Sequence, residues 1–249
     1  MAVTHSPFFL EGTNKEALVM FIHGFMGSPK QFVKLAGAAH MQGFSVAALL
    51  LPGHSGSVKE FASCTFERWQ DHVLSEVERY SRHHSDIWLV GHSMGGLLAI
   101  NAAVAHNEHV RGVFMLACPF KLTMFSAHAV KVRMMQVFGR RSNPVKAAYR
   151  DGSGLVLSPR LILSLAKPMN EVKRLMQAAR ENLPYVRVPV TAVYSASDEL
   201  TNIASMDILK SELTAAPLET LLLVDSFHAY YTELEQEVIT EALIGMISA

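Results

Sequence analysis

Short runs of apolar residues alternate along the chain with longer segments in which apolar residues recur every three or four positions. The short runs predict buried β-strands, because they stop at glycine, proline or polar residues. The longer segments predict amphipathic helices. Strands are predicted at residues 17–22, 45–50, 86–90, 110–117, 190–195 and 219–224, and helices at residues 29–42, 66–83, 97–106, 202–213 and 232–247.

Residues 119–185 break this alternation, because they contain helix-like segments and no convincing strand. The better helix candidates are 124–138, 159–167 and 170–182, and the loop RDGSG at residues 150–154 separates two of them. Alternating strands and helices predict an α/β fold with a mostly parallel, doubly wound sheet covered on both faces. We expect a core built from residues 1–118 and 186–249, with residues 119–185 inserted as a helical lid or cap.

Composition narrows the classes of function that fit. Half of the 249 residues are apolar, which is enough for one sizeable core. Lysine plus arginine equals aspartate plus glutamate, at 22 each, so there is no general electrostatic reason to bind nucleic acid or an anionic membrane. The N-terminus does not resemble a signal peptide, and no apolar stretch is long enough to span a bilayer. We expect a cytoplasmic protein without stable membrane insertion.

The cysteines and histidines do not form a recognisable metal-binding pattern. Cys64 and Cys118 make no C-x-x-C pair and suggest no disulfide framework, and Cys118, which follows an apolar run, is expected to be a buried apolar position. His83 and His84 are adjacent, so on a helix their side chains diverge, and there is no H-E-x-x-H sequence. We therefore expect neither a metal nor another cofactor.

The sequence LVGHSMGGLL places a serine between a predicted strand and a predicted helix. A strand that reverses into a helix within one residue strains that residue, and the residues two before and two after it crowd one another. Gly91 and Gly95 remove this clash, and Gly96 lets the helix lie close to the sheet. The pattern is a G-x-S-x-G nucleophile elbow. Ser93 is therefore the predicted nucleophile, and the Met94 N–H points at whatever Ser93 attacks.

A serine hydroxyl needs a base to remove its proton, and with such an elbow the expected order along the chain is serine, acid, histidine. His228 follows the last predicted strand and is the expected base. Two carboxylates compete for the third role: Asp198, which follows the strand at 190–195, and Asp225, three residues before His228. Asp198 is preferred, because a side chain on the neighbouring strand end reaches the ring nitrogen opposite the serine more easily. Glu199 is a third option.

Acyl transfer also needs hydrogen-bond donors for the oxyanion. One is the Met94 N–H, and the other is expected from the loop after an early strand. The sequence FIHGFMGSP lies at that place. Gly24 and Gly27 allow a close approach of the backbone, and the N–H of Phe25 is the expected second donor. His23 is expected to orient this loop through a satisfied hydrogen bond.

Taken in order, these motifs resemble those of the α/β hydrolases over nearly the whole chain. HGFMGSP, LPGHSGS and GHSMGG, with the late Asp198 and His228, are similar to small bacterial carboxylesterases and monoacylglycerol lipases, and ACPFKL resembles the start of their lid. The resemblance implies a sheet of the α/β-hydrolase type with a helical lid. It also implies a triad of Ser93, Asp198 and His228, and an oxyanion hole formed by the N–H groups of Phe25 and Met94.

Three positions depart from the family pattern. Ser195 stands three residues before the acid, where the family often has glycine, and Ser226-Phe227-His228 replaces S-G-H around the base. The P-G-H-G loop reads PGHSG, one residue off. None of these changes removes a catalytic group, but each affects the shape of the substrate site. The bulky Phe227 would narrow the pocket or reposition the imidazole ring of His228.

The predicted lid is rich in methionine and other apolar residues. Much of this surface must pack the lid onto the core, but together it forms an adaptable cover that suits an alkyl or aryl chain. No arginine pair is placed to clamp a phosphate or dicarboxylate. This favours an uncharged, small hydrophobic ester with a short-to-medium acyl chain, or a monoacylglycerol-like substrate. The residues expected to bind it are Phe25, Met124, Phe125, Met134 and Phe227.

The leading hypothesis is a serine esterase or monoacylglycerol-lipase-like enzyme, monomeric or homodimeric, that acts through an acyl-enzyme on Ser93. Two alternatives stay open. The same triad could hydrolyse a thioester, an amide or a C–C bond, because fold and triad do not separate these reactions. The scaffold could also serve as a non-enzymatic receptor for a small ligand.

Overall fold

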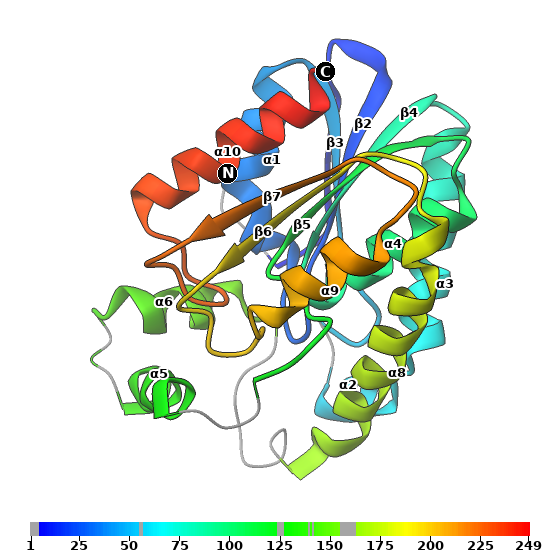
Figure 1. Cartoon of the computed structure of the whole chain (residues 1–249). Coiled ribbons are helices and arrows are strands. Elements are labelled where there is room, and N and C mark those ends of the chain that lie inside the picture. Colours follow the sequence, from blue (N-terminus) through cyan, green and yellow to red (C-terminus); the bar gives the residue numbers. More distant parts are fainter. Residues whose placement is uncertain (1–4, 55–56, 124–126, 139, 141, 155–162) are drawn as a thin grey trace.

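The computed structural model describes residues 5–54, 57–123, 127–138, 140, 142–154 and 163–249, and these form a sheet with helices on both faces (Figure 1). The sheet has seven strands in the order β1-β3-β2-β4-β5-β6-β7. The strands are β1 (Phe8–Leu10), β2 (Asn14–Ile22), β3 (Phe44–Leu49), β4 (Asp86–His92), β5 (Val110–Leu116), β6 (Val190–Ser195) and β7 (Leu218–Leu223).

All neighbouring strands are parallel except β1, which pairs antiparallel with β3 through Phe8 and Ala48. All six predicted strands are present. The central strands read as continuous apolar runs because both of their faces are covered, and every residue of β3 is buried. The predicted α/β fold with a mostly parallel sheet is therefore confirmed. β1 is an addition that the apolar pattern does not predict.

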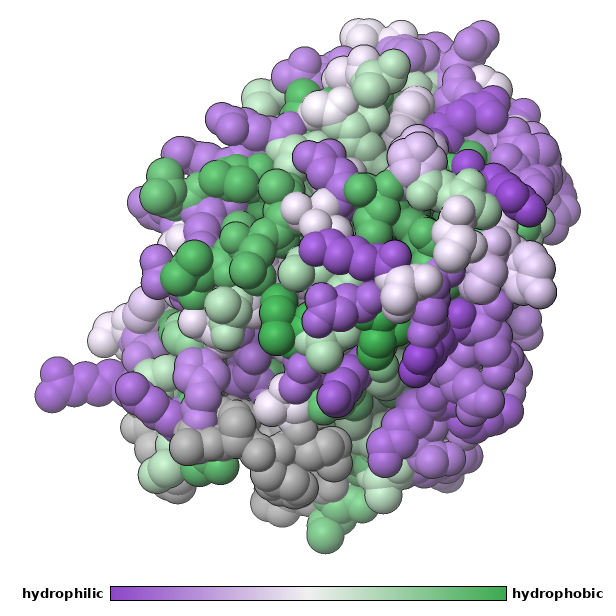
Figure 2. Space-filling model, viewed as in Figure 1, coloured by the Kyte–Doolittle hydropathy of each residue, from purple (hydrophilic) through white to green (hydrophobic). Residues whose placement is uncertain are grey.

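Helices form the outer layers, with α1 and α10 on one face and α3, α4, α8 and α9 on the other (Figure 1). The longer helices are α1 (Val33–Met41), α3 (Phe66–Ser81), α4 (Met94–Ala105), α8 (Ala166–Asn182), α9 (Ala204–Glu212) and α10 (Glu233–Ile247). Figure 2 shows hydrophilic residues over α3 and α8, and apolar residues near the β7 edge, where Leu222 and Val224 are exposed.

The helices of the predicted lid occupy two different places. α8 packs against α3 and α4, and its buried Val172, Leu175 and Ala179 join the same apolar cluster as Trp69. By contrast, α5 (Ala127–Phe138) and α6 (Pro144–Gly152) lie beyond the carboxyl ends of β6 and β7 (Figure 1). The division of the chain into core and lid stays a prediction. Of the helix expected at 159–167, residues 159–162 lie outside the described residues, 163–164 are helical, and 166–167 are the start of α8.

The apolar pattern does not predict two short helices, α2 (Val58–Ser63) and α6, although each begins with a capping signal. In α6 the Asn143 side chain accepts a hydrogen bond from the Lys146 N–H, and Pro144 occupies the first turn. The helix continues to Gly152, so most of the loop predicted at residues 150–154 is helical and that prediction is wrong. In α2, a capping box starts the helix. There are also two 3-10 turns, η1 (Pro29–Phe32) and η2 (Leu183–Tyr185).

The glycines around Ser93 show why the turn there tolerates so little bulk. A Cβ on Gly91 would lie 2.4 Å from the Gly95 carbonyl carbon, so the expected crowding of these two residues is confirmed. A Cβ on Gly95 would lie 2.0 Å from the Ile22 carbonyl oxygen, at the end of β2. A Cβ on Gly96 would lie 2.9 Å from the Cys118 sulfur. The start of α4 is therefore pressed against the sheet.

Two buried histidines link the ends of β2 and β3. His23 Nε2 accepts a hydrogen bond from the Leu51 N–H at 3.0 Å, so its Nδ1 carries the proton and donates to the Gly24 carbonyl at 2.9 Å. His54 Nδ1 lies 3.1 Å from the Pro52 carbonyl, and the two imidazole rings are 4.8 Å apart. Burial lowers the pKa of His23 well below its ordinary value and lowers the pKa of His54 to about 4. Both rings are neutral, and the expected orienting role of His23 agrees with its hydrogen bonds.

We expect Gly95→Ala to lower the free energy of unfolding by about 3 kcal/mol, because the new methyl group cannot fit against the β2 backbone. Gly37→Ala is the matched control, because a Cβ on Gly37 in α1 meets nothing within 4 Å. It should raise the free energy of unfolding by about 0.5–1 kcal/mol. Urea unfolding of both variants checks this, and equal behaviour of the two would contradict the packing described.

We expect the protein to lose stability as the pH falls from about 6.5 toward 4, because the unfolded chain then binds protons that the buried histidines of the native state do not. His54 alone accounts for about 3 kcal/mol of this loss. Urea unfolding at several pH values should therefore show a shallower pH dependence for His54→Phe than for the wild type. His83→Gln, at an exposed position, should keep the wild-type pH dependence. A His54→Phe curve parallel to the wild type would contradict the assignment.

Candidate active site

Ser93 lies between the end of β4 and the start of α4, in a backbone conformation that residues with side chains rarely adopt. Its φ is +53° and its ψ is −120°. Such strain persists only where the surrounding structure fixes it, and it gathers at functional sites. Here the Ser93 N–H donates to the Leu116 carbonyl at 2.7 Å, and the Ser93 carbonyl accepts from the Gly96 N–H at 2.9 Å. The turn therefore holds the hydroxyl at the carboxyl end of the sheet.

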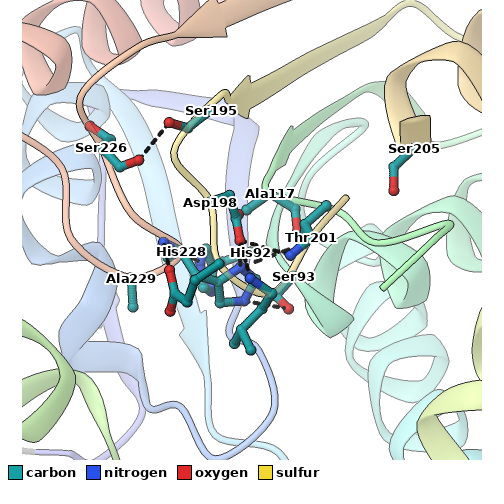
Figure 3. Close-up of polar contacts among 12 residues, drawn as sticks. His92, Ser93, Ala117, Ser195, Asp198, Thr201, Ser205, Ser226, His228 and Ala229 are labelled. Atoms are coloured by element: carbon teal, nitrogen blue, oxygen red, sulfur yellow. Dashed lines mark hydrogen bonds and ion pairs between the residues drawn. The ribbon is translucent and has the colours of Figure 1, made fainter. Parts of the chain in front are cut away.

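The structure brings Ser93, His228 and Asp198 together, although they come from three separate parts of the chain (Figure 3). His228 Nε2 lies 2.9 Å from Ser93 Oγ. On the other side of the ring, Nδ1 lies 2.9 Å and 3.1 Å from the two carboxylate oxygens of Asp198. The carboxylate accepts the Nδ1 proton, so Nε2 is left to accept the proton of the serine hydroxyl. This is the arrangement needed to activate a serine.

Asp198 is itself held in place by the loop that follows it. Its Oδ1 accepts hydrogen bonds from the Leu200 N–H at 2.8 Å and the Thr201 N–H at 2.7 Å. Asp225 is exposed, and its backbone N–H donates to the Glu235 side chain. Of the two competing carboxylates, Asp198 therefore faces the imidazole.

Glu199, the third option for the acid, is fully buried but bonds to the backbone of His228 rather than to its ring. Its Oε2 accepts the His228 N–H at 3.1 Å. The His228 carbonyl is held as well, because it accepts from His92 Nε2 at 2.8 Å. Burial, followed by the positive form of His228 nearby, lowers the pKa of His92 to about 4, so this ring is neutral. The loop that carries His228 is therefore held at both the N–H and the carbonyl of this residue.

The charges around His228 favour its protonated form. Burial alone lowers the pKa of this histidine, but the Asp198 carboxylate and its hydrogen bond to Nδ1 raise it, and the Glu199 charge adds to this. The net result is a pKa above the ordinary value. A ring in these surroundings accepts a proton from the serine readily, because the imidazolium that forms is stabilised by a paired carboxylate.

Ser195, which stands where the family often has glycine, links the end of β6 to residues 226–231, called here the base loop. Its hydroxyl donates to the Ser226 carbonyl (Figure 3). The same oxygen accepts the Ser197 N–H at 3.2 Å. Sequence reasoning identifies the departure from the family pattern but not this hydrogen bond, because nothing in the local sequence indicates that Ser226 lies beside it.

The loop expected to supply an oxyanion donor lies against the serine turn. A Cβ on Gly24 would lie 3.0 Å from the Ser93 Cβ. The loop turns through a hydrogen bond from the Gly27 N–H to the Gly24 carbonyl at 2.9 Å, with Met26 at a left-handed φ of +59°. Within the described part of the chain, the Phe25 N–H donates no hydrogen bond, and the same holds for the Met94 N–H at the start of α4. Both N–H groups are therefore available to a ligand.

The residues predicted to contact a substrate lie in different surroundings. The Phe25 ring packs on Phe61, with centroids 5.0 Å apart. The Phe227 ring stacks on His128 of α5 at 5.8 Å, which connects the base loop to that helix. Met134, also on α5, is 56% exposed. Met124 and Phe125 lie outside the described residues, and the part that any of these residues plays in binding stays a prediction.

Two absences hold for the residues that the structure describes. Among them, no cluster of three or more histidine, cysteine, aspartate or glutamate side chains is arranged to hold a metal ion. Within the same part of the chain, no helix is both long enough and apolar enough to cross a membrane.

Comparison with known proteins now places this geometry in a family. The model of the family Hydrolase_4, described as serine aminopeptidase, S33, matches residues 13–235. The chain belongs to this α/β-hydrolase family. It is an esterase- or lipase-like α/β hydrolase.

Relatives of this α/β hydrolase extend over almost its whole length. A thermostable monoacylglycerol lipase from Bacillus sp. (strain H-257) is 23% identical over 241 residues, which cover 94% of this chain and 91% of the relative. A solved structure from work on LipS and LipT, two metagenome-derived lipolytic enzymes, has a TM-score of 0.77 at 20% identity and covers 98% of this chain and 97% of that chain. The monoacylglycerol lipase of Paleococcus ferrophilus has a TM-score of 0.72 at 20% identity, covering 97% and 98%.

Proposed function

We propose that this α/β hydrolase cleaves uncharged carboxylic esters with a short-to-medium acyl chain, or monoacylglycerol-like esters, through an acyl-enzyme on Ser93. The observation that carries the proposal is the chain of hydrogen-bond distances from Ser93 through His228 to Asp198, 2.9 Å at each step. The monoacylglycerol lipases among its relatives support the choice of substrate class. No cofactor takes part in the proposed reaction.

In the first step, the Ser93 oxygen attacks the carbonyl carbon of the ester while its proton passes to His228 Nε2. Asp198 stabilises the imidazolium that forms. The carbonyl oxygen becomes negative and accepts hydrogen bonds from the N–H groups of Phe25 and Met94. The tetrahedral intermediate then collapses. Its C–O bond to the alcohol breaks, His228 returns the proton to the leaving oxygen, and the acyl group remains on Ser93.

In the second step, water takes the place of the alcohol. His228 accepts a proton from the water as its oxygen attacks the acyl carbon, and the same two N–H groups bind the second oxyanion. Breaking the bond to Ser93 releases a carboxylic acid and returns the proton to the serine oxygen. The raised pKa of His228 suits a group that must both accept and donate a proton in each cycle.

The proposed substrate contacts follow from the apolar side chains near the site. Phe25 and Met94 supply the backbone donors. Phe227 of the base loop and Met134 of α5 are the proposed contacts with the acyl or the alcohol part of the ester. Residues 119–185 form the proposed cap, in which α5 and α6 lie beside the site. A panel of p-nitrophenyl esters, a thioester, an amide and a diketone compares ester cleavage with the other bonds that such a triad hydrolyses.

We expect a fluorophosphonate probe to label the protein on Ser93, because labelling requires the nucleophile, the base and the oxyanion donors together. Peptide mapping should place the adduct on the peptide that contains this residue. Ser93→Ala should lose the label and lower the turnover of p-nitrophenyl butyrate on the order of 10⁵–10⁶-fold, with the unfolding curve preserved. Turnover that persists in Ser93→Ala would remove this residue from the mechanism.

We expect Asp198→Asn to lower kcat by about 10⁴-fold, because the amide cannot stabilise the imidazolium or fix the Nδ1 proton. Asp225→Asn is the matched control, since this carboxylate is exposed and does not face the ring. Its kcat should stay within about twofold of the wild type. Steady-state kinetics of both variants on the same ester decide between the two acids, and a reversed order of losses would assign the role to Asp225.

A further inference from the structure

Helix α6, which precedes the strands β6 and β7 in the chain, contacts the two loops on which the proposed reaction depends. We propose that α6 is a positioning element that holds the base loop through Tyr149 and the oxyanion loop through Ser153. The oxyanion loop is defined here as residues 24–27. The proposal rests on the function proposed above and deepens it, because it makes part of the cap responsible for the geometry of the site.

The contact with the base loop runs through a buried carboxylate. The Tyr149 hydroxyl donates to Glu199 Oε1 and accepts the Ala229 N–H at 3.3 Å. Glu199, fully buried, accepts the His228 N–H at 3.1 Å on its other oxygen. Burial and the Glu199 charge raise the pKa of Tyr149 well above its ordinary value, so the hydroxyl keeps its proton and remains a donor. One tyrosine of α6 therefore helps to hold the backbone N–H groups of two consecutive residues, His228 through Glu199 and Ala229 directly.

The contact with the oxyanion loop is formed by the residues that end α6. The Met26 carbonyl accepts two hydrogen bonds at 3.0 Å, one from the Ser153 hydroxyl and one from the Gly154 N–H. Met26 has the left-handed φ that favours glycine, so its conformation needs support from outside the loop. The proposed donor, the Phe25 N–H, belongs to the residue immediately before Met26. A shift at Met26 would therefore turn this donor away from the oxyanion.

The opposite flank of α6 is not packed against α10. A cleft of about 840 Å³ separates these helices, and its walls include Ala148 and Asp151 from α6 and Glu237 and Thr240 from α10. Further along, the Ser28 hydroxyl donates to the Gly152 carbonyl at 3.1 Å. The position of α6 beside the site thus depends on these polar contacts as well as on its packing against α5 and η1. Displacement of this helix would loosen the base loop and the oxyanion loop together.

The test compares Tyr149→Phe, Ser153→Ala and the double variant in the full chain, with Tyr185→Phe as the matched control. Tyr185 is exposed in η2, which precedes β6 and so lies away from the carboxyl ends of the strands. Turnover of p-nitrophenyl butyrate is measured per active site, with the active sites counted by fluorophosphonate titration. Unfolded molecules then do not enter the value of kcat.

We expect Tyr149→Phe to lower kcat about tenfold and Ser153→Ala about threefold, with KM within about twofold of the wild type. The loss in the double variant should be smaller than the product of the two single losses, because one broken contact already frees the helix. Tyr185→Phe should keep the wild-type kcat.

An unchanged kcat per active site in Tyr149→Phe would overturn the proposal, even if its melting temperature fell, because a purely structural contact has that effect alone. Losses that multiply in the double variant would also overturn it, since the two contacts would then act separately. An equal loss in Tyr185→Phe would do the same. A wild-type chain that neither reacts with the probe nor hydrolyses the ester would instead refute the function proposed above.

Discussion

The reversal of β4 into α4 at a single residue is the constraint on which the rest of the site depends. Ser93 can hold its left-handed conformation only because Gly91 and Gly95 leave room for the backbone to fold back on itself. The same lack of side chains brings α4 into contact with the end of β2, and so brings the oxyanion loop beside the serine. One steric requirement thus sets both the position of the Ser93 hydroxyl and the distance to its neighbours.

His228, the proposed base, is fixed by a different means, which is hydrogen bonding to buried groups rather than steric fit. Asp198 aligns the His228 ring, while Glu199 and His92 hold the peptide groups on either side of it. Burying two carboxylates so close together is costly unless each has donors, and here backbone N–H groups and a tyrosine hydroxyl supply them. The loop is therefore rigid at the residue that must meet the serine.

The sequence predicts the strands well, and the residues it proposes as a triad lie together in the structure, but it predicts neither helix α6 nor the contacts of that helix. Buried parallel strands are continuous apolar runs, so β3 and β6 can be recognised without knowing their neighbours. The elbow and the order of serine, acid and histidine are likewise local or sequential features. β1 has only three residues and exists through its pairing with β3. The contacts of Tyr149 arise from tertiary packing, and no spacing of residues along the chain predicts them.

Ser93 and His228 are 135 residues apart, yet their side chains meet within hydrogen-bond distance. During synthesis the serine turn and its flanking strands emerge long before the histidine does, and contacts of such large sequence separation form slowly. A nascent chain therefore carries the proposed nucleophile without its proposed base while β6 and β7 are still being added. The geometry of the candidate triad is among the last features of the fold to form, because it needs the loop that follows β7.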